Sequence, residues 1–225
     1  MEPTMDIMQA MQERHAVRSY TDEPVSDEVK QVLQAKIDEV NREGDLHVQM
    51  VCDEPQAFSG RMAKTFTGVT NYFAMIGTKG DDLSERIGYY GEELVLLAQQ
   101  LGLNTCWVAM TYSKVKSAFT VGANEKLVVV IPFGHGATQG EPHEAKKDAS
   151  KVSTVEGEAP AWFSKGVEAA LLAPTASNQQ VFHFTLKEGN KVEAKAGTGF
   201  YAKVDLGIVK LHFELGAGTE NFTWA

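Results

Sequence analysis

The chain has 225 residues and a mass of 24.6 kDa, which suits one domain or two small halves. Hydrophobic residues make up 43% and charged residues 23%, which is the balance of a globular protein and excludes a disordered chain. The formal net charge of −9 argues against nucleic acid or an anionic membrane surface as the main partner.

Neither a targeting segment nor a membrane span is expected. The N-terminal residues show no basic region followed by an apolar one, so we do not expect a signal peptide. The longest apolar run, residues 127–133, is far shorter than the ~20 residues that a membrane helix requires. Cys52 and Cys106 lie in apolar stretches and are expected to be buried free thiols. We therefore expect a cytoplasmic protein with no membrane partner.

The chain begins with two predicted helices. Asp6 is a typical N-cap residue, with a glutamine three residues later as in a capping box, so we expect a helix that ends near Glu13. An irregular basic stretch, residues 14–20, follows it. Apolar residues at helical spacing after Ser26 predict a second helix, which we expect to stop at Gly44.

Strands and helices continue to alternate up to residue 133. A polar stretch with glycines and a proline predicts a loop at 54–68, and the clearest helix is 85–101, closed by Gly102. The other expected elements are strands at 46–50, 69–76, 105–109 and 127–131, and a short helix at 113–119. This alternation points to a mixed α/β or α+β domain.

Composition changes after residue 133, which predicts the organisation of the chain. Small and polar residues dominate 134–159, which we interpret as an extended connector. We therefore expect a first lobe at 1–133 and a second lobe at 160–225 that packs on the same core. A loose match between 26–52 and 161–187 adds the hypothesis of an internal pseudo-repeat.

The second lobe contains one clear hairpin signal. Residues 161–172 form an expected helix that breaks at Pro174. Alternating apolar residues on both sides of a Gly-Asn turn at 189–190 predict a β-hairpin. Residues 204–215 fit a helix and a strand equally well.

Two segments carry residue types suited to ligand chemistry. Arg14 and Arg18 place two planar cations four residues apart, which suits a phosphate or the carbonyl edge of a heterocycle. The alternative is that they pair with nearby acids, which are Asp22, Glu23 and Asp27. Residues 173–180 combine small residues, hydroxyls and amides that can approach a flat ligand, the alternative being a polar connecting turn. The residues His135, Glu141, His143 and Glu144 fit no standard metal-site spacing, so we expect a solvated loop there.

Together these segments resemble motifs of the nitroreductase family of FMN-dependent oxidoreductases. Residues 14–18, Arg-His-Ala-Val-Arg, are similar to its RHSxK/R motif, and residues 174–182 are similar to its PSxxNxQPW motif. Residues 101–109 resemble its Leu-Gly-Leu turn before a short strand. Two features depart from the pattern: Ala16 replaces a serine, and the PSxxNxQPW-like segment lies in the second half of the chain. The resemblance is thus to a variant group with a rearranged, partly duplicated chain.

The resemblance implies an α+β fold with a mainly antiparallel central sheet flanked by helices. It implies an enzyme that passes hydride from NADH or NADPH through FMN to a small electron-poor acceptor, such as a nitro compound or quinone. The alternative is a flavin-binding carrier or sensor without efficient turnover. It also implies a homodimer, or a pseudo-dimeric monomer in which the second half replaces the partner subunit.

The resemblance also implies the site residues. No side chain is needed as a catalytic acid or base, because hydride transfer requires none. The residues expected to bind the cofactor are Arg14, His15, Ala16, Arg18, Trp107, Val108, Ala109, Lys146, Lys147, Pro174, Thr175, Ala176, Ser177, Asn178 and Gln180.

Overall fold

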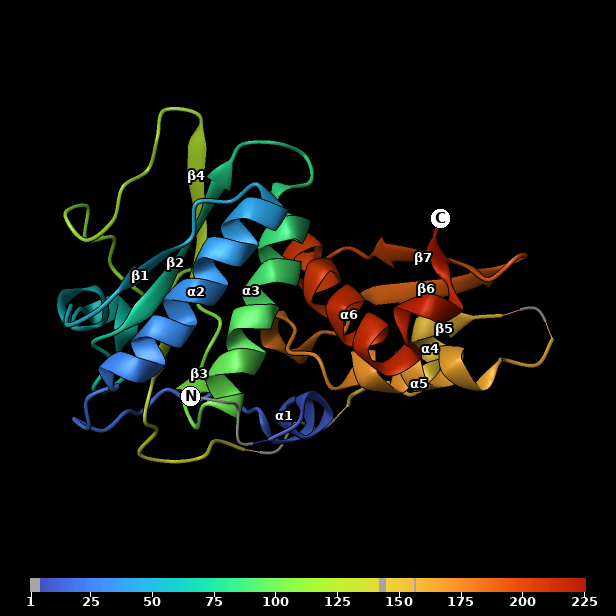
Figure 1. Cartoon of the computed structure of the whole chain (residues 1–225), viewed down its shortest axis with the longest axis horizontal. Coiled ribbons are helices and arrows are strands. Elements are labelled where there is room, and N and C mark those ends of the chain that lie inside the picture. Colours follow the sequence, from blue (N-terminus) through green and yellow to red (C-terminus); the bar gives the residue numbers. More distant parts are fainter. Residues whose placement is uncertain (1–4, 142–144, 156) are drawn as a thin grey trace. The chain divides into compact units, whose positions relative to one another are not determined.

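The computed structural model describes residues 5–141, 145–155 and 157–225 (Figure 1). These residues form two compact units. The first unit comprises Met1–Leu83 and Leu94–Pro142, and the second comprises Ser84–Glu93 and His143–Ala225. The long helix α3, Leu83–Gln100, contributes to both.

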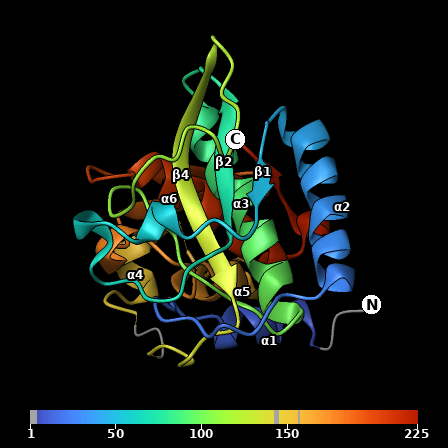
Figure 2. The same ribbon diagram turned by 90° about the vertical axis from the view of Figure 1, so that its left-hand side faces the viewer.

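The first unit is built on an antiparallel sheet of four strands in the order β1-β2-β4-β3. Figure 2 shows β1, β2 and β4 side by side. The strands are β1 (Gln49–Val51), β2 (Tyr72–Thr78), β3 (Asn104–Thr105) and β4 (Glu125–Gly134). Both central strands are almost continuously apolar and buried, which is why β4 pairs along its whole length, with β2 and then β3.

The helices of the first unit begin where the sequence predicts. In α1 (Ile7–Glu13) the Asp6 carboxylate accepts the backbone N–H of Gln9 at 2.9 Å. In α2 (Asp27–Gly44) the Ser26 hydroxyl accepts the backbone N–H of Val29 at 3.3 Å. The expected stop is displaced by one residue, because the left-handed cap is Asp45 (φ 47°) and Gly44 is still helical.

Two other predictions in the first unit need correction. The helix expected at 113–119 is wrong: these residues form turns, because the N–H of Ser113 donates to Ala57 in the short helix η1 (Gln56–Phe58). A second short helix, η2 (Arg61–Ala63), lies in the predicted loop. The strand expected at 105–109 is reduced to β3, followed by a single bridge between Val108 and Val130.

The second unit has its own four-stranded sheet, β5-β6-β7-β8, so the described residues contain two sheets rather than one central sheet. The strands are β5 (Ser153–Thr154), β6 (Phe182–Lys187), β7 (Lys191–Ala196) and β8 (Thr223–Trp224). The predicted hairpin is confirmed as β6–β7, with Gly189 and Asn190 both at positive φ in its turn. The outer strands run parallel to their neighbours: β5 pairs with β6, and β8 pairs with β7.

Helices complete the second unit. They are α4 (Ala149–Val152), α5 (Ala161–Leu171), η3 (Ala176–Asn178), α6 (Ala202–Ala217) and η4 (Thr219–Asn221). The ambiguous segment 204–215 is helical, because apolar residues on every side of α6 are buried. The segment expected to be an extended connector contains α4 and β5, and Val152 of α4 is fully buried.

Glycines let α6 lie unusually close to the Ser84–Glu93 part of α3. A Cβ atom at Gly207 would overlap the carbonyl oxygen of Glu85, and one at Gly88 would overlap the carbonyl oxygen of Val204. Only a residue without Cβ fits at these two positions. The contact therefore depends on a glycine from each helix.

A buried polar pair links the same two helices. His212 on α6 and Glu92 on α3 are both 0% exposed, and His212 Nε2 lies 3.0 Å from Glu92 Oε1. The other ring nitrogen, Nδ1, lies 3.2 Å from the carbonyl oxygen of Ala169 on α5. A carbonyl only accepts, so Nδ1 carries a proton, and a second proton is shared between Nε2 and the carboxyl group.

Candidate functional site

In the first unit, the structure brings together two of the motifs that the sequence singled out. Arg14 is the C-cap of α1, and the chain then turns to run beside β3. Ala16 forms a parallel bridge with Thr105, and the N–H of Val17 donates to the Thr105 carbonyl at 3.0 Å. Residues 14–18 thus lie against the start of the segment 105–109.

Two arginines belong to this junction. Arg14 is 3% exposed, whereas Arg18 is exposed. Burial raises the pKa of the Cys106 thiol, and the charges of Arg18 and Arg14 oppose that rise. Of the acids considered as alternative partners, Glu23 lies 3.9 Å from His135, and Asp27 occupies the first turn of α2.

A glycine-rich loop, residues 134–140, packs over the same segment. Nδ1 of His15 lies 3.1 Å from the Gln139 carbonyl oxygen, to which it donates. Gly140 has φ +74°, and a Cβ there would come within 2.9 Å of the Cβ of His15. The N–H of Gly136 donates to the Asn104 side chain at 3.0 Å. These contacts set the position of His15 and the backbone of 15–17.

The segment 105–109 presents backbone groups alternately to β4 and away from it. Val108 exchanges both backbone hydrogen bonds with Val130 at 2.9 Å, and Cys106 donates to Pro132 at 3.3 Å. Val108 is also buried, so its backbone is not available to a ligand, which corrects the expectation for this residue. The Cys106 thiol donates to the carbonyl oxygen of Trp107 at 3.7 Å, and Ala109 lies in a bend directly after the Val108–Val130 bridge.

In the second unit, the predicted loop 174–180 adopts a strained backbone. Ser177, Asn178 and Gln180 have φ of 53°, 50° and 46°, in the left-handed region that residues with a Cβ seldom occupy. Such strain persists only where surrounding contacts over-determine it, and it concentrates at functional sites. The loop is therefore a candidate for ligand contact on grounds independent of its sequence.

Gln180 and the two lysines hold this loop through hydrogen bonds. Gln180 is 0% exposed, and its side-chain oxygen accepts the backbone N–H groups of Lys146 at 2.8 Å and Lys147 at 3.0 Å. The ammonium groups donate to carbonyls within the loop, Lys146 to Ser177 at 3.2 Å and Lys147 to Gln180 at 2.7 Å. Each ammonium group has three donors, so the expected phosphate contacts stay predictions.

Sequence reasoning missed the residue that holds the loop from its other side. The Asp205 carboxylate, on the first turn of α6, accepts the Ala176 N–H at 3.0 Å and the Gln179 side-chain amide at 3.0 Å. The available signal was an acidic residue within an apolar helical stretch, since acids are rarely buried without a partner. The expected cofactor residues thus fall into two groups, one in each unit.

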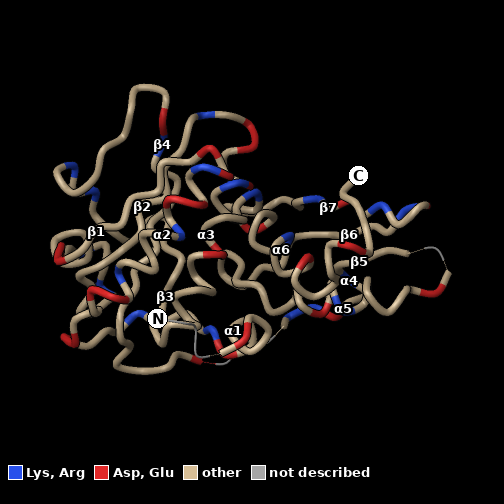
Figure 3. The backbone as a smooth tube through the Cα atoms, viewed as in Figure 1, with Lys and Arg blue, Asp and Glu red and all other residues tan. Residues whose placement is uncertain are grey.

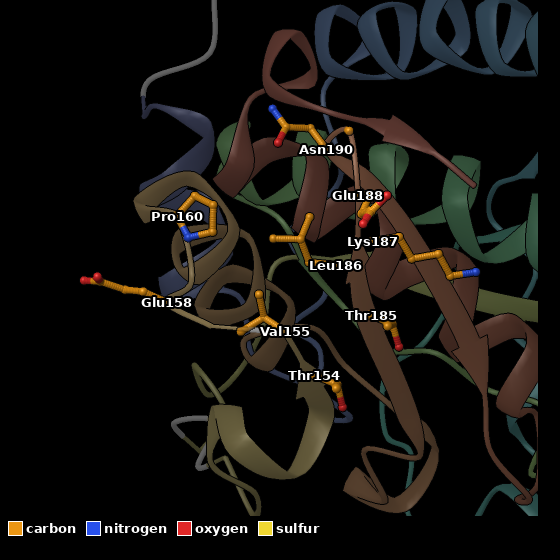
Figure 4. A pocket seen from close by; sticks show the side chains of 10 residues that line it. Thr154, Val155, Glu158, Pro160, Thr185, Leu186, Lys187, Glu188 and Asn190 are labelled. Carbon is orange, nitrogen blue, oxygen red and sulfur yellow. The ribbon is translucent and has the colours of Figure 1, made fainter.

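Each unit also has a pocket outside these groups. One, of about 650 Å³, lies beside the β6–β7 turn and is lined by residues such as Thr154, Leu186 and Asn190 (Figure 4). The other, of about 380 Å³, lies in the first unit and includes Lys30 and Asp53. Neither is lined by a residue expected to bind the cofactor.

Other properties of the chain bear on its partners. In each unit, Figure 3 shows Lys and Arg interspersed with Asp and Glu along the chain. Of the possible metal-loop residues, His143 and Glu144 lie outside the described residues; within the described ones, no three His, Cys, Asp or Glu side chains gather to hold a metal. Every helix in the described ranges is too short or too polar to cross a lipid bilayer.

Comparisons with known proteins agree with the fold. A solved "putative nitroreductase" of Thermotoga maritima superposes with a TM-score of 0.65 at 21% identity, covering 96% of this chain and 85% of its own. An FMN-dependent nitroreductase of Clostridium difficile superposes with a TM-score of 0.53 at 16% identity, and the match covers 64% of this chain and 96% of that protein. A "putative nitroreductase" of Desulfovibrio desulfuricans in complex with FMN superposes with a TM-score of 0.53 at 18% identity, and the match covers 69% of this chain and 99% of that protein.

One family model matches nearly the whole chain. The comparison with curated proteins gives no significant match. The model of the family described as "Putative TM nitroreductase" matches residues 6–217, which include both groups of candidate residues. The chain has a nitroreductase-like α+β fold and belongs to this nitroreductase family.

Proposed function

We propose that this protein is an FMN-dependent oxidoreductase that takes hydride from NADH or NADPH and reduces a small electron-poor acceptor, such as a nitro compound or quinone. The observation that carries the proposal is the pairing of the Arg14–Arg18 segment with Thr105, which sets two arginines at the start of the segment 105–109. Two fixed cations next to directed backbone groups suit a ligand with a phosphate and a heterocyclic edge. The residues present therefore fit FMN.

The residues of 14–18 would bind and orient the cofactor. Arg14 and Arg18 supply planar, permanently charged donors, which favour negative charge on the phosphate and on the reduced ring system. His15 is oriented by Gln139, which leaves Nε2 as its remaining ring nitrogen. Ala16 contributes only backbone, since it lacks the hydroxyl of the family serine.

The segment 107–109 would lie beside the ring. Backbone amide groups can hydrogen-bond the edge of a flat heterocycle without any side chain. Val108 is not among them, because its backbone pairs with Val130. The chemistry that FMN supplies when bound is acceptance of a hydride and delivery of electrons to the acceptor. Residues 174–178 stay predicted cofactor contacts, supported by their strained backbone.

Of the two states that the resemblance implies, a homodimer or a pseudo-dimeric monomer, we propose the monomer. Native mass spectrometry of the flavin-loaded protein should then show one FMN per monomer. Flavin found only in dimers would contradict this part of the proposal and leave the cofactor assignment intact.

The cofactor assignment is tested by incubation with FMN, desalting and measurement of the visible spectrum. We expect retained flavin absorption, bleached by NADH or NADPH and restored by a quinone, with ping-pong kinetics. Arg18→Ala should weaken FMN binding by about 10- to 100-fold, since a charged hydrogen bond is worth about 1.5–3 kcal/mol. The control Arg42→Ala removes an exposed arginine of α2 and should change nothing. A colourless wild-type protein refutes the assignment, and bound flavin that no nicotinamide reduces favours a carrier or sensor.

A further inference from the structure

Asp205 occupies a central place behind the loop 174–180. Its side chain is buried at 4% exposure, and both carboxylate oxygens accept the N–H of Ala176, at 3.0 and 3.1 Å. One of these oxygens also accepts the side-chain amide of Gln179 at 3.0 Å. The same amide donates to the Phe200 carbonyl at 2.7 Å. Asp205 thus ties the start of α6 to both ends of η3.

The loop needs such a restraint. Ser177, Asn178 and Gln180 are all left-handed without being glycine, a conformation that relaxes unless neighbouring groups hold it. Lys146 and Lys147 hold the carbonyl side of the loop through Ser177 and Gln180. Asp205 provides the opposing restraint on its N–H side, and it does so with a single titratable group.

We propose that Asp205 is a positioning residue: its ionised carboxylate holds the loop 174–180 in the left-handed conformation, and protonation of this carboxylate releases the loop. A carboxylate accepts through both oxygens, whereas a carboxylic acid turns one of them into a donor that opposes the N–H groups of Ala176 and Gln179. In consequence FMN binding weakens at acidic pH, a step that rests on the function proposed above.

The surroundings of Asp205 allow this titration near neutral pH. Burial raises the pKa of Asp205 to about 6, against the smaller opposing effects of the hydrogen bonds from Gln179 and Ala176. The charged residues on the elements packed around it are Lys203 on α6, Glu85 and Arg86 on α3, and Lys146 and Lys147 beside the loop. None of these charges contributes to the shift.

The sign of the shift separates loop release from acid unfolding. The folded protein binds this proton more tightly than the unfolded chain does, whose Asp has a pKa near 3.8. The contribution of Asp205 to the free energy of unfolding therefore increases as pH falls from about 6 towards 3.8. Release of the loop removes the hydrogen bonds from Gln179 and Ala176, which lower the pKa of Asp205, and leaves the carboxyl group buried, so the released form binds the proton more tightly still. Local order and this part of global stability therefore change in opposite directions over the same pH range.

Amide hydrogen exchange of the full chain without flavin tests the proposal. We expect the peptide that contains 176–180, corrected for intrinsic rates, to lose at least ~10-fold of its protection between pH 7.5 and 5. In Asp205→Asn, which has a similar shape but places an amide opposite Gln179, exchange should be fast at both pH values. The matched control is Glu54→Gln, because Glu54 caps η1 through Gln56 and Ala57 in the first unit. This control should leave the loop profile unchanged.

The outcomes distinguish the two proposals. Wild-type loop exchange that does not depend on pH, or an Asp205→Asn loop as protected as wild type, overturns the positioning role. If Asp205→Asn does not fold, the wild-type pH profile alone decides. A loop that titrates in a protein that never binds FMN supports the positioning role and refutes the proposed function. FMN affinity that is equal at pH 5 and 7.5 while the loop titrates overturns the link to the cofactor.

Discussion

The buried pair of His212 and Glu92 offers a sharp test of the packing of the second unit. Both side chains are 0% exposed, so solvent does not screen their interaction. Glu92→Leu removes the partner of Nε2 and leaves a buried ring nitrogen, or a buried charge, without its acceptor. Breaking a buried pair from one side costs about 3–5 kcal/mol of unfolding free energy, and full burial favours the upper half of that range.

Glu92→Gln is the matched control because it retains a hydrogen bond. The introduced side-chain amide can donate to Nε2 of a neutral imidazole whose Nδ1–H still donates to Ala169. The pair then keeps a neutral hydrogen bond and loses only the additional strength that a charged partner gives, so we expect the free energy of unfolding to fall by about 1 kcal/mol. The structure therefore predicts a large difference between two substitutions at one position.

Urea unfolding followed by tryptophan fluorescence measures this difference. Trp162 and Trp224 lie in the second unit and Trp107 in the first, so a Trp107→Phe background reports the second unit alone. At about 2–4 °C per kcal/mol for a chain of this size, a cost of about 4–5 kcal/mol for Glu92→Leu should lower the Tm by about 8–20 °C. A loss below about 1 kcal/mol for Glu92→Leu, or equal losses for both variants, would refute the reasoning.

Two further substitutions probe local determinants. Gly207→Ala should force α6 away from α3 and destabilise the second unit by at least about 2 kcal/mol in the same assay, because the new Cβ overlaps the Glu85 carbonyl oxygen. Gly80→Ala is its control, since a Cβ there meets only the far end of the Asp82 side chain. Because Gly80 lies in the first unit, the two variants are compared by urea unfolding with all three tryptophans in place, and equal effects would contradict the close approach. Ser26→Ala should cost about 1 kcal/mol by removing the cap of α2, and Ser26→Asp should restore stability, as thermal unfolding by circular dichroism can show.

Local signals in the sequence were sufficient for several elements. The caps Asp6 and Ser26 determine where α1 and α2 begin, because each satisfies a backbone N–H within its own first turn. The Gly-Asn pair at 189–190 marks the turn of the β6–β7 hairpin, because both residues adopt the positive φ that the three-residue loop 188–190 needs between Lys187 and Lys191. Motif similarity also indicated the family, which the match over residues 6–217 confirms.

The placement of single groups in the site depended on contacts between distant segments. Val108 was expected to present its backbone to the cofactor, but its N–H and carbonyl groups both hydrogen-bond Val130 on β4. No local sequence pattern indicates this pairing. Lys146 and Lys147 were expected to face a phosphate, but their ammonium groups donate to loop carbonyls more than thirty residues away. Such bonds arise only once the chain has folded.

Contacts between distant segments also decide the secondary structure of 204–215 and the position of the loop 174–180. The apolar residues of 204–215 suited either a helix or a strand, and the choice depends on burial of every side of the segment in the second unit. Once helical, it places Asp205 against Ala176 and Gln179, next to the left-handed residues Ser177, Asn178 and Gln180. The sequence by itself determined which segments are candidates for ligand binding, because residue type and local capping are written in it. Which atoms remain available for binding was decided by tertiary structure, because partners far apart in the chain occupy the rest.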